Sequence, residues 1–225
     1  FQERFRVELM NAYGLSEAPT ATHGNPLSGV NKAGSIGMPL PDTESKLVSL
    51  EDGVTEVAPG EEGELIIRGP QVFKGYWNMP TETAYTLRDL HDGGGPRLIT
   101  GDIAKMDTDG YFYIVDRKKE LIKPGGFQVW PREVEEVIIK HPAILEVGVA
   151  GVPDAQAGEA VKAWVVFKPG MTATEDELRA FCKKELTGYK VPKYFEVRDA
   201  LPRTTVGKVL RRELVREHKE KAGIK

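Results

Sequence analysis

A lysine in a glycine turn near the C-terminus is the residue best suited to chemistry in this chain. Residues 201–208 read LPRTTVGK, where Pro202 fixes the chain direction and Gly207 permits a tight turn before Lys208. A lysine on such a loop is a movable positive charge, suited to oxygens that gain charge in a transition state. Activation of a carboxylate by adenylation needs a cation of this kind beside the α-phosphate. A lone Gly-Lys pair more often only solvates a surface, so the neighbouring motifs carry the interpretation.

Residues 13–17, Tyr-Gly-Leu-Ser-Glu, combine groups that fit a nucleotide. A turn at Tyr13 and Gly14 offers an aromatic face and main-chain groups to a base. Ser16 can bind a phosphate oxygen, and Glu17 can hold the Mg²⁺ that accompanies a nucleotide. A packed tyrosine and a solvated glutamate explain the pentapeptide equally well.

Asp102 follows Thr100 and Gly101, and a carboxylate after a glycine turn can accept both hydroxyl groups of a ribose. An acidic residue has this role in dinucleotide-binding folds. Taken alone, the tripeptide more often forms a turn in which the aspartate caps the backbone.

A basic stretch followed by glycines lies near the middle of the chain. Arg117, Lys119 and Lys123 suit phosphates, and residues 125–128, Gly-Gly-Phe-Gln, let a ligand pass close to the backbone. A basic linker followed by a glycine turn is the structural alternative. The four histidines lack metal-ligand spacing, and Cys182 falls in the middle of a predicted helix, where packing is its expected role.

The first half of the chain predicts a small β-rich unit. Five short β-type runs are separated by Gly, Pro and Asp turn signals, at residues 46–50, 64–68, 97–100, 103–106 and 111–115. The last two runs flank Asp-Thr-Asp-Gly, a sequence typical of a hairpin turn.

The second half alternates between helical and strand patterns. Helices are predicted at residues 131–140 and 209–221. A third predicted helix begins at a capping box at residues 174–177, runs to about Leu186 and stops at Gly188. Strands are predicted at residues 144–152, 160–167 and 194–197. This order indicates an α+β fold with two domains, residues 1–116 and 117–225, joined in the charged stretch around 116–119.

Composition is ordinary for a globular protein: 40% hydrophobic, 29% charged, net charge −3. This balance does not favour a nucleic-acid partner. The single cysteine excludes an internal disulfide and fits a reducing compartment, and we find no secretory signal, so we expect a cytoplasmic location. No apolar run approaches the roughly 20 residues of a membrane span, which leaves only peripheral membrane contact open.

The four motifs, taken in the order in which they occur along the chain, resemble those of the acyl-adenylate-forming superfamily of AMP-binding enzymes. This superfamily includes acyl-CoA synthetases, adenylation domains and luciferases. The resemblance covers essentially the whole chain, and Gly63-Glu64-Leu65, Gly75-Tyr76 and Pro80 also match the pattern. The chain is most similar to the C-terminal part of bacterial long-chain fatty-acid–CoA ligases, through residues 116–123, 131–135 and 208–212.

The resemblance implies a role for each motif residue. Lys208 is the adenylation lysine, Lys119 the hinge, and Glu17 serves Mg²⁺; Lys123 and Gln128 approach the adenylate or coenzyme A. The nucleotide and pantetheine are contacted by Tyr13, Gly14, Ser16, Asp102, Arg117, Gly125, Gly126 and Phe127. The resemblance also implies that a small C-terminal domain rotates between the two half-reactions.

Two departures from the family pattern count. Ser16 stands where the family usually has Thr, which keeps the hydroxyl. The phosphate-gripping loop and most of the acyl pocket belong to an N-terminal region of the family that is not in this sequence. We therefore expect the chain to be the β-rich end of the large domain followed by the small mobile domain, and to be inactive alone.

The functional expectation is an acid–thiol ligase. It would use ATP, coenzyme A and a fatty acid, with Mg²⁺, to make fatty acyl-AMP and then fatty acyl-CoA. An adenylation domain that serves a carrier protein is one alternative, and a non-catalytic nucleotide-binding module is another. A homodimer through the N-terminal region of the family is a further expectation.

Overall fold

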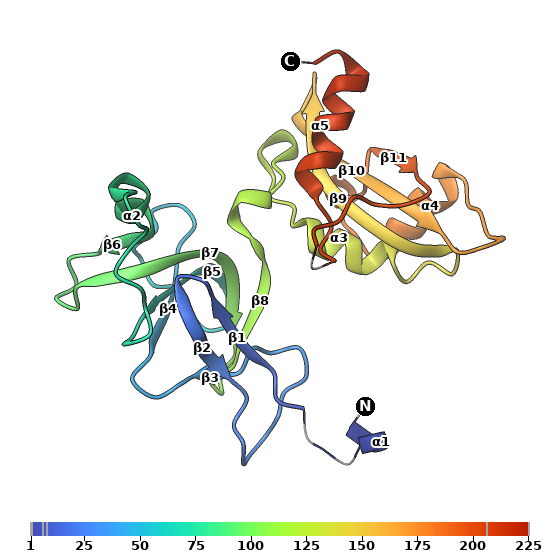
Figure 1. Cartoon of the computed structure of the whole chain (residues 1–225). Coiled ribbons are helices and arrows are strands. Elements are labelled where there is room, and N and C mark those ends of the chain that lie inside the picture. The colour runs from blue at the N-terminus through green and yellow to red at the C-terminus, as the bar shows by residue number, and fades with distance from the viewer. Residues whose placement is uncertain (1, 6, 8, 206, 225) are drawn as a thin grey trace. The chain divides into compact units, whose positions relative to one another are not determined.

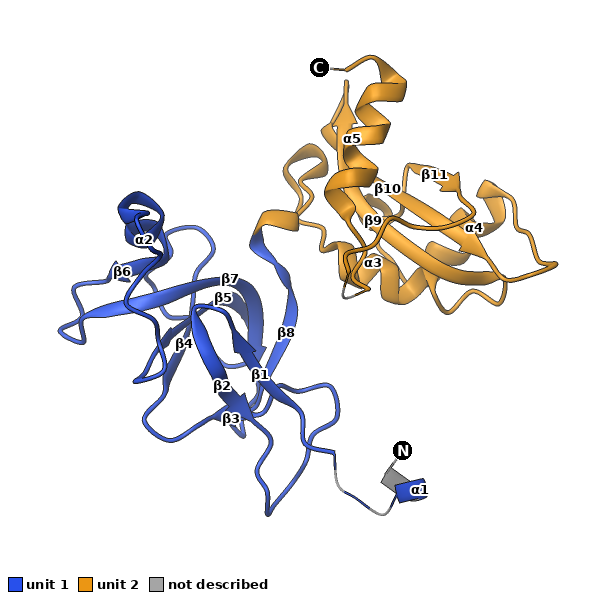
Figure 2. Cartoon of the chain, in the orientation of Figure 1, with its two compact units in different colours: residues 1–118 blue, residues 119–225 orange. Residues whose placement is uncertain are grey.

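The computed structural model of the chain describes residues 2–5, 7, 9–205 and 207–224. It divides into two compact units, residues 1–118 and 119–225 (Figure 2). The division falls inside the charged stretch 116–119 in which the sequence places the junction. Each unit has its own core and is described by itself.

Unit 1 consists of antiparallel sheets. A three-stranded sheet has the order β1-β2-β3, with β1 at Ala12–Leu15, β2 at Ala18–Gly24 and β3 at Met38–Pro39 (Figure 1). A five-stranded sheet has the order β4-β5-β7-β6, with β8 also paired to β7. Its strands are β4 (Glu44–Val48), β5 (Glu62–Arg68), β6 (Leu87–Asp89), β7 (Pro96–Met106) and β8 (Phe112–Arg117). Two short helices, α1 (Gln2–Phe5) and α2 (Pro80–Thr86), complete the unit.

One core serves both sheets of unit 1. Ala18 of the smaller sheet packs in the same buried cluster as Leu65, Ile67 and Leu98 of the larger sheet. β5 is buried over five consecutive residues, which is the pattern of a strand covered on both faces. This shared core fixes the positions of the hairpin β1–β2 and of β7 relative to each other.

The prediction of separate strands at 97–100 and 103–106 is wrong. Both runs belong to the one strand β7, which carries a bulge: Ile99 pairs with Ile66 and Ile103 pairs with Glu64. Gly101 has a φ of 71°, which breaks the apolar pattern of the sequence without ending the strand.

Unit 2 is a three-stranded sheet with helices on both faces. Its order is β11-β10-β9, with β9 (Ile144–Asp154) antiparallel and β11 (Tyr194–Val197) parallel to β10 (Gly158–Phe167). The α-helices are α3 (Pro131–Ile138), α4 (Glu175–Cys182) and α5 (Arg211–Ala222), and short 3₁₀ turns lie at η1 (Lys118–Glu120), η2 (Pro124–Gly126) and η3 (Gly188–Lys190).

The period-two pattern of β10 separates two cores in unit 2. Val161, Ala163 and Val165 face the cluster that contains residues of α3 and α4. Trp164 and Val166 face the second cluster, which contains Leu214 of α5. A strand buried on both faces is thus the physical basis of this layered arrangement.

The α+β fold class is confirmed, and so is the capping box. The Thr174 side chain accepts from the Glu177 N–H, and the Glu177 carboxylate accepts from the Thr174 N–H. Two predicted boundaries are wrong. Helix α4 ends at Cys182, four residues before the predicted Leu186, and α5 begins at Arg211 because Val209 forms a bridge with Arg203. Among the described residues, none of the helices has the length and apolarity to cross a membrane.

Candidate functional site

The pentapeptide 13–17 lies on the hairpin β1–β2. Tyr13, Gly14 and Leu15 are in strand β1, and Ser16 and Glu17 form the two-residue turn, because Leu15 pairs with Ala18. The predicted turn at Tyr13 and Gly14 is therefore wrong: the turn lies three residues later. As a result, Tyr13 is fixed by strand pairing while the hydroxyl of Ser16 and the carboxylate of Glu17 sit at the tip.

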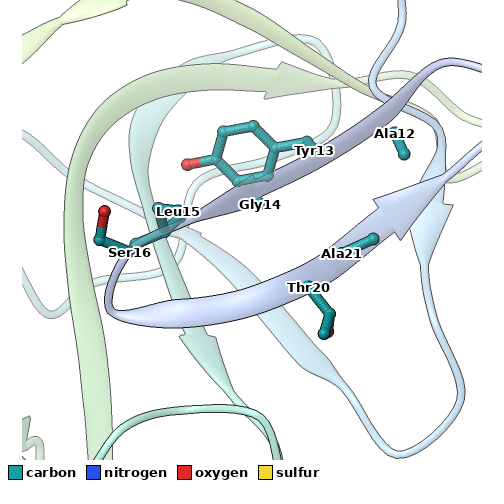
Figure 3. Close-up of a pocket in the computed structure, with 7 residues that line it drawn as sticks. All are labelled: Ala12, Tyr13, Gly14, Leu15, Ser16, Thr20 and Ala21. Carbon is teal, nitrogen blue, oxygen red and sulfur yellow. The ribbon is translucent and has the colours of Figure 1, made fainter.

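Glycine is required at position 14 by a close approach of the opposite strand. A Cβ there would lie 1.9 Å from the carbonyl oxygen of Thr20, whose own φ of 81° belongs to the bulge between the strands. This hairpin bounds a pocket of about 640 Å³ lined by residues 12–16, Thr20 and Ala21. Figure 3 shows the Tyr13 ring projecting from β1 and the Ser16 hydroxyl at the turn. Three of the predicted nucleotide residues, Tyr13, Gly14 and Ser16, thus line one pocket.

Asp102 is joined to this hairpin. Its carboxylate accepts a hydrogen bond of 2.5 Å from the Tyr13 hydroxyl and an ion pair of 2.6 Å from Nε of Arg117. The bulge at Gly101 turns Asp102 in this direction, and the backbone N–H of Asp102 is itself held by the Thr100 hydroxyl. Three residues that the sequence proposed separately, from β1, β7 and β8, therefore form one connected group.

The Asp102 carboxylate is buried, with a side chain that is only 3% exposed. Burial, together with the charge of Asp102, raises the pKa of Tyr13, so its hydroxyl remains a donor throughout the physiological range. The Tyr13 hydroxyl therefore stays a donor to a carboxylate whose orientation is already set by Arg117.

His23 is a buried neighbour of Tyr13 that the sequence analysis missed. It pairs with Tyr13 across the hairpin, and its ring lies edge-on to Tyr13 at 5.8 Å and to Phe112 at 5.0 Å between centroids. Burial lowers the pKa of His23 to about 4, and its Nε2 has no hydrogen-bond partner among the described residues. The sequence analysis considered the histidines only as possible metal ligands. The position of His23 against Tyr13 follows instead from the register of the hairpin.

The carboxylate of Glu17 is the kind of ligand that a nucleotide-bound Mg²⁺ takes. One carboxylate oxygen, Oε1, accepts a hydrogen bond of 2.5 Å from the Tyr76 hydroxyl, and Oε2 has no partner in the part of the chain that the structure describes. Mg²⁺ in such sites is held by one or two carboxylates, substrate phosphates and water.

Lys208 sits on a small loop whose backbone is held closely. The Thr204 N–H donates to the Lys208 carbonyl at 2.8 Å, and the Lys208 N–H donates to the Thr204 hydroxyl at 3.1 Å. Gly207 has a φ of 84°, as its turn requires. The Thr204 hydroxyl thus accepts a hydrogen bond within the loop. Arg203 anchors the loop to Glu146 of β9 at 2.8 Å.

The Lys208 side chain is exposed and has no ion-pair partner among the residues the structure describes. A fixed backbone with a free ammonium group is what a mobile point charge needs. Val206, which lies in the same predicted turn, falls outside the described residues.

The predicted pantetheine residues form a second loop of unit 2. It is closed by a pair of backbone hydrogen bonds between Ile122 and Val129, of 3.0 and 2.9 Å. Gly125 and Gly126 have φ values of 58° and 88°, so both use the freedom of glycine. Exposed on this loop are Lys123, Gly125, Gly126, Phe127 and Gln128.

Tyr189 is another residue that the sequence analysis did not single out. Its ring stacks on Phe127, with centroids 4.6 Å apart and planes 16° apart. It lies on η3, in the segment that the sequence assigned only as a helix stop at Gly188. The stack holds the apolar side chain of the glycine loop at the surface of unit 2.

Ion pairs flank the junction on both sides. Lys118 lies 2.6 Å from the carboxylate of Glu64, and Arg117 is paired with Asp102, so the last two residues of unit 1 are tied to that unit. Glu120 is paired with Arg211, within unit 2. Lys119, between them, is exposed.

Comparison with known proteins identifies the class of proteins to which this fold belongs. Residues 1–77 match the family model for AMP-binding enzymes, and residues 133–208 match the model for the C-terminal domain of AMP-binding enzymes. The chain belongs to the AMP-binding enzyme family.

Relatives with known names are similar over nearly all of this chain. A long-chain-fatty-acid–CoA ligase of Bacillus subtilis is 52% identical over 97% of the chain, and a 2-succinylbenzoate–CoA ligase of Geobacillus kaustophilus is 42% identical over 93%. The matched regions span 38% and 41% of those proteins. The crystal structure of ATP-bound MatB from Rhodopseudomonas palustris matches with a TM-score of 0.87 and 36% identity, over 94% of this chain and 41% of that chain.

Proposed function

We propose that the protein that contains this chain is an ATP-dependent acid–CoA ligase that acts on long-chain fatty acids. The observation that carries the proposal is the connected group Tyr13, Asp102 and Arg117 beside the hairpin pocket. It supplies an aromatic ring, a buried carboxylate and a cation, which are the groups that a base, a ribose and a phosphate need. The name of the Bacillus subtilis relative supports the fatty-acid substrate.

In the first half-reaction, the substrate carboxylate attacks the α-phosphorus of ATP and pyrophosphate leaves with the electron pair of the broken P–O bond. Asp102 holds the ribose and Tyr13 lies against the adenine, so the α-phosphate is oriented before attack. Ser16 and Arg117 contact phosphate or ribose oxygens. Mg²⁺, when bound beside Glu17, neutralises charge on the leaving phosphates.

Lys208 stabilises the charge that develops between the carboxylate and the α-phosphate. Its ammonium group is exposed on a loop held by Thr204 and Arg203, which lets the side chain reach a ligand without reorganising its backbone. A preorganised donor of this type typically contributes a factor of about a hundred or more to the rate.

In the second half-reaction, the thiol of coenzyme A loses its proton to solvent, the resulting thiolate attacks the acyl carbon, and AMP leaves with the electron pair of the broken C–O bond. The glycine loop of unit 2 serves the pantetheine arm, with Gly125, Gly126 and Phe127 beside it, and Lys123 and Gln128 approach the adenylate. The stack of Phe127 on Tyr189 supports this assignment, because it keeps an apolar side chain at the surface where the arm would pass.

Lys119 is the hinge between the two half-reactions. The ion pairs of Arg117 and Lys118 within unit 1, and of Glu120 within unit 2, support this assignment. They restrain the neighbours of Lys119 on either side, which favours rotation at Lys119 over rotation at those neighbours. Hinges commonly consist of a few residues at element ends that absorb the backbone change.

The test is acid-dependent exchange between ATP and pyrophosphate, measured on the protein translated from the whole open reading frame. Long-chain fatty acids are compared with 2-succinylbenzoate, acetate and amino acids, because one relative carries the 2-succinylbenzoate name. Free coenzyme A is then compared with a phosphopantetheinyl carrier protein as acceptor. Exchange that is strongest with a long-chain acid, with release of acyl-CoA, supports the proposal; exchange with none of these acids contradicts it.

A further inference from the structure

The segment between β5 and α2 makes two hydrogen bonds to Glu17. We propose that Tyr76, within that segment, is a positioning residue that holds the Glu17 carboxylate in the orientation in which it meets the metal of a bound magnesium–nucleotide. The inference rests on the proposed function, because it takes Glu17 as the residue that serves this metal.

Both contacts join parts of the chain that are far apart in sequence. The Tyr76 hydroxyl donates to Oε1 of Glu17 at 2.5 Å across 59 residues. Three residues earlier, the backbone N–H of Phe73 donates to the Glu17 carbonyl at 2.8 Å. One contact therefore fixes the backbone of Glu17 and the other fixes its carboxylate.

Tyr76 is itself held by groups other than Glu17. Its ring lies edge-on against Phe73, with centroids 4.8 Å apart and planes 79° apart, and its N–H donates to the Thr83 hydroxyl at 2.9 Å. The preceding Gly75 has a φ of 140°, and a Cβ there would lie 2.6 Å from Cγ2 of Thr83. The position of the Tyr76 hydroxyl is therefore set within its own segment, and it can impose an orientation on Glu17.

A glutamate at a hairpin turn needs such a restraint. Free side chains of this length sample several rotamers, and ordering one of them opposes binding. The Tyr76 hydroxyl engages Oε1 and leaves Oε2, which has no partner among the described residues, for the cation. Partners behind a metal-binding carboxylate commonly orient it in this way, and their loss typically weakens metal binding about tenfold or more.

The competing explanation is that Tyr76 only ties the hairpin to the segment before α2. A tie of that kind would alter thermal stability or nucleotide binding without regard to metal. The metal dependence of binding separates the two explanations.

The experiment uses the protein from the whole open reading frame with Mn²⁺ as a spectroscopic probe of the Mg²⁺ site. Free Mn²⁺ is titrated by electron paramagnetic resonance in the presence of a non-hydrolysable ATP analogue. The variants are Tyr76→Phe, Glu17→Gln and the double variant. Tyr113→Phe is the matched control, because its hydroxyl also donates to a carboxylate, that of Asp107 at 3.1 Å, among residues outside the pocket lining.

We expect Tyr76→Phe to weaken Mn²⁺ binding in the nucleotide complex about tenfold. The affinity for the metal-free analogue should stay within about twofold, and Tyr113→Phe should match the wild type. The double variant should bind Mn²⁺ no more weakly than Glu17→Gln, because Tyr76 acts only through that carboxylate. The concentration of free Mg²⁺ at half-maximal exchange should rise in parallel.

Unchanged Mn²⁺ affinity in Tyr76→Phe, with a clear loss in Glu17→Gln, overturns this inference and leaves the proposed function standing. Additive losses in the double variant overturn it as well. A third outcome is acid-dependent exchange in the wild type together with unchanged metal affinity in Glu17→Gln. This outcome would show that Glu17 does not serve the metal, and it would overturn this inference too. A wild-type protein with no exchange overturns the proposed function itself.

Discussion

The hydroxyl of Tyr13 donates to the carboxylate of Asp102 at 2.5 Å and so joins residues 89 positions apart in the chain. Strand β1 carries one partner and the bulge of β7 carries the other. The bond orients the carboxylate before any ligand arrives, and Arg117 completes the arrangement from β8. The proposed role of Asp102 in holding a ribose depends on this preorganisation.

The first prediction concerns recognition of the ribose. Asp102→Asn should raise the KM for ATP about ten- to a hundredfold, because a hydrogen bond to a charged acceptor is worth about 1.5–3 kcal/mol. It should also abolish the preference for ATP over 2′,3′-dideoxy-ATP, whereas Tyr13→Phe, which keeps the ring, should have a smaller effect. Initial rates of exchange with the two nucleotides measure this. Asp109→Asn, at an exposed ion pair with Lys32, is the control.

Full retention of the dideoxy discrimination in Asp102→Asn would contradict the assignment of this residue to the ribose. A loss of folding in the variant would be visible as a lower melting temperature, and the Tyr13→Phe variant then carries the test.

A second prediction concerns the junction. Lys118→Met leaves the carboxylate of Glu64, whose side chain is 4% exposed, without its cation at 2.6 Å. Because Lys118 is partly exposed and water can replace part of the interaction, we expect a loss of about 1–3 kcal/mol of stability. Adding Glu64→Gln should restore most of it. Lys140→Met, in an exposed pair with Glu185, should cost less than about 1 kcal/mol.

Thermal unfolding followed by circular dichroism measures both effects, and limited proteolysis shows whether the junction opens. If Lys118→Met unfolds at the wild-type temperature and resists protease equally well, the ion pair does not restrain the junction.

The third prediction is a pH dependence that arises from His23. Burial lowers its pKa in the folded protein to about 4, while the unfolded chain has the ordinary value of 6.5. Between these values the unfolded state binds more protons, so stability rises with pH there. The contribution is therefore present above about pH 6.5 and is lost progressively as the pH falls to about 4. Its full size is about 3 kcal/mol.

The groups that face His23 are the Tyr13 ring, the Phe112 ring and the Thr22 hydroxyl. His23→Phe should flatten the pH dependence of stability between pH 6.5 and 4, and urea unfolding at a series of pH values measures it. His91→Gln, at a side chain that is 89% exposed, should leave the slope as it is. An unchanged slope in His23→Phe would show that other groups carry the acid sensitivity.

Local signals in the sequence predicted several elements well. The capping box at Thr174 requires only residues three apart, and the strands β9 and β10 follow from apolar runs bounded by turn residues. The end of α4 was wrong for a physical reason. Leu186 is buried and continues the apolar pattern, but it enters the core from a turn after Cys182.

The pocket could be predicted only in part. Motif residues such as Tyr13 and Asp102 were identified by type and order, yet their bond depends on a bulge in β7 that no local pattern reveals. The contribution of His23 depends on hairpin register, and that of Tyr76 on a contact across 59 residues. Long-range register and bulges are tertiary properties, so local patterns do not predict either role, although Tyr76 belongs to a dipeptide that matches the family pattern.

The central claim is that Lys208 serves adenylation. The most direct measurement is fatty-acid-dependent ATP–pyrophosphate exchange on the protein from the whole open reading frame, with Lys208→Ala beside the wild type and Lys183→Ala as an exposed-lysine control. We predict a loss of about a hundredfold or more in Lys208→Ala and no change in Lys183→Ala. Exchange at the wild-type rate in Lys208→Ala would contradict the account.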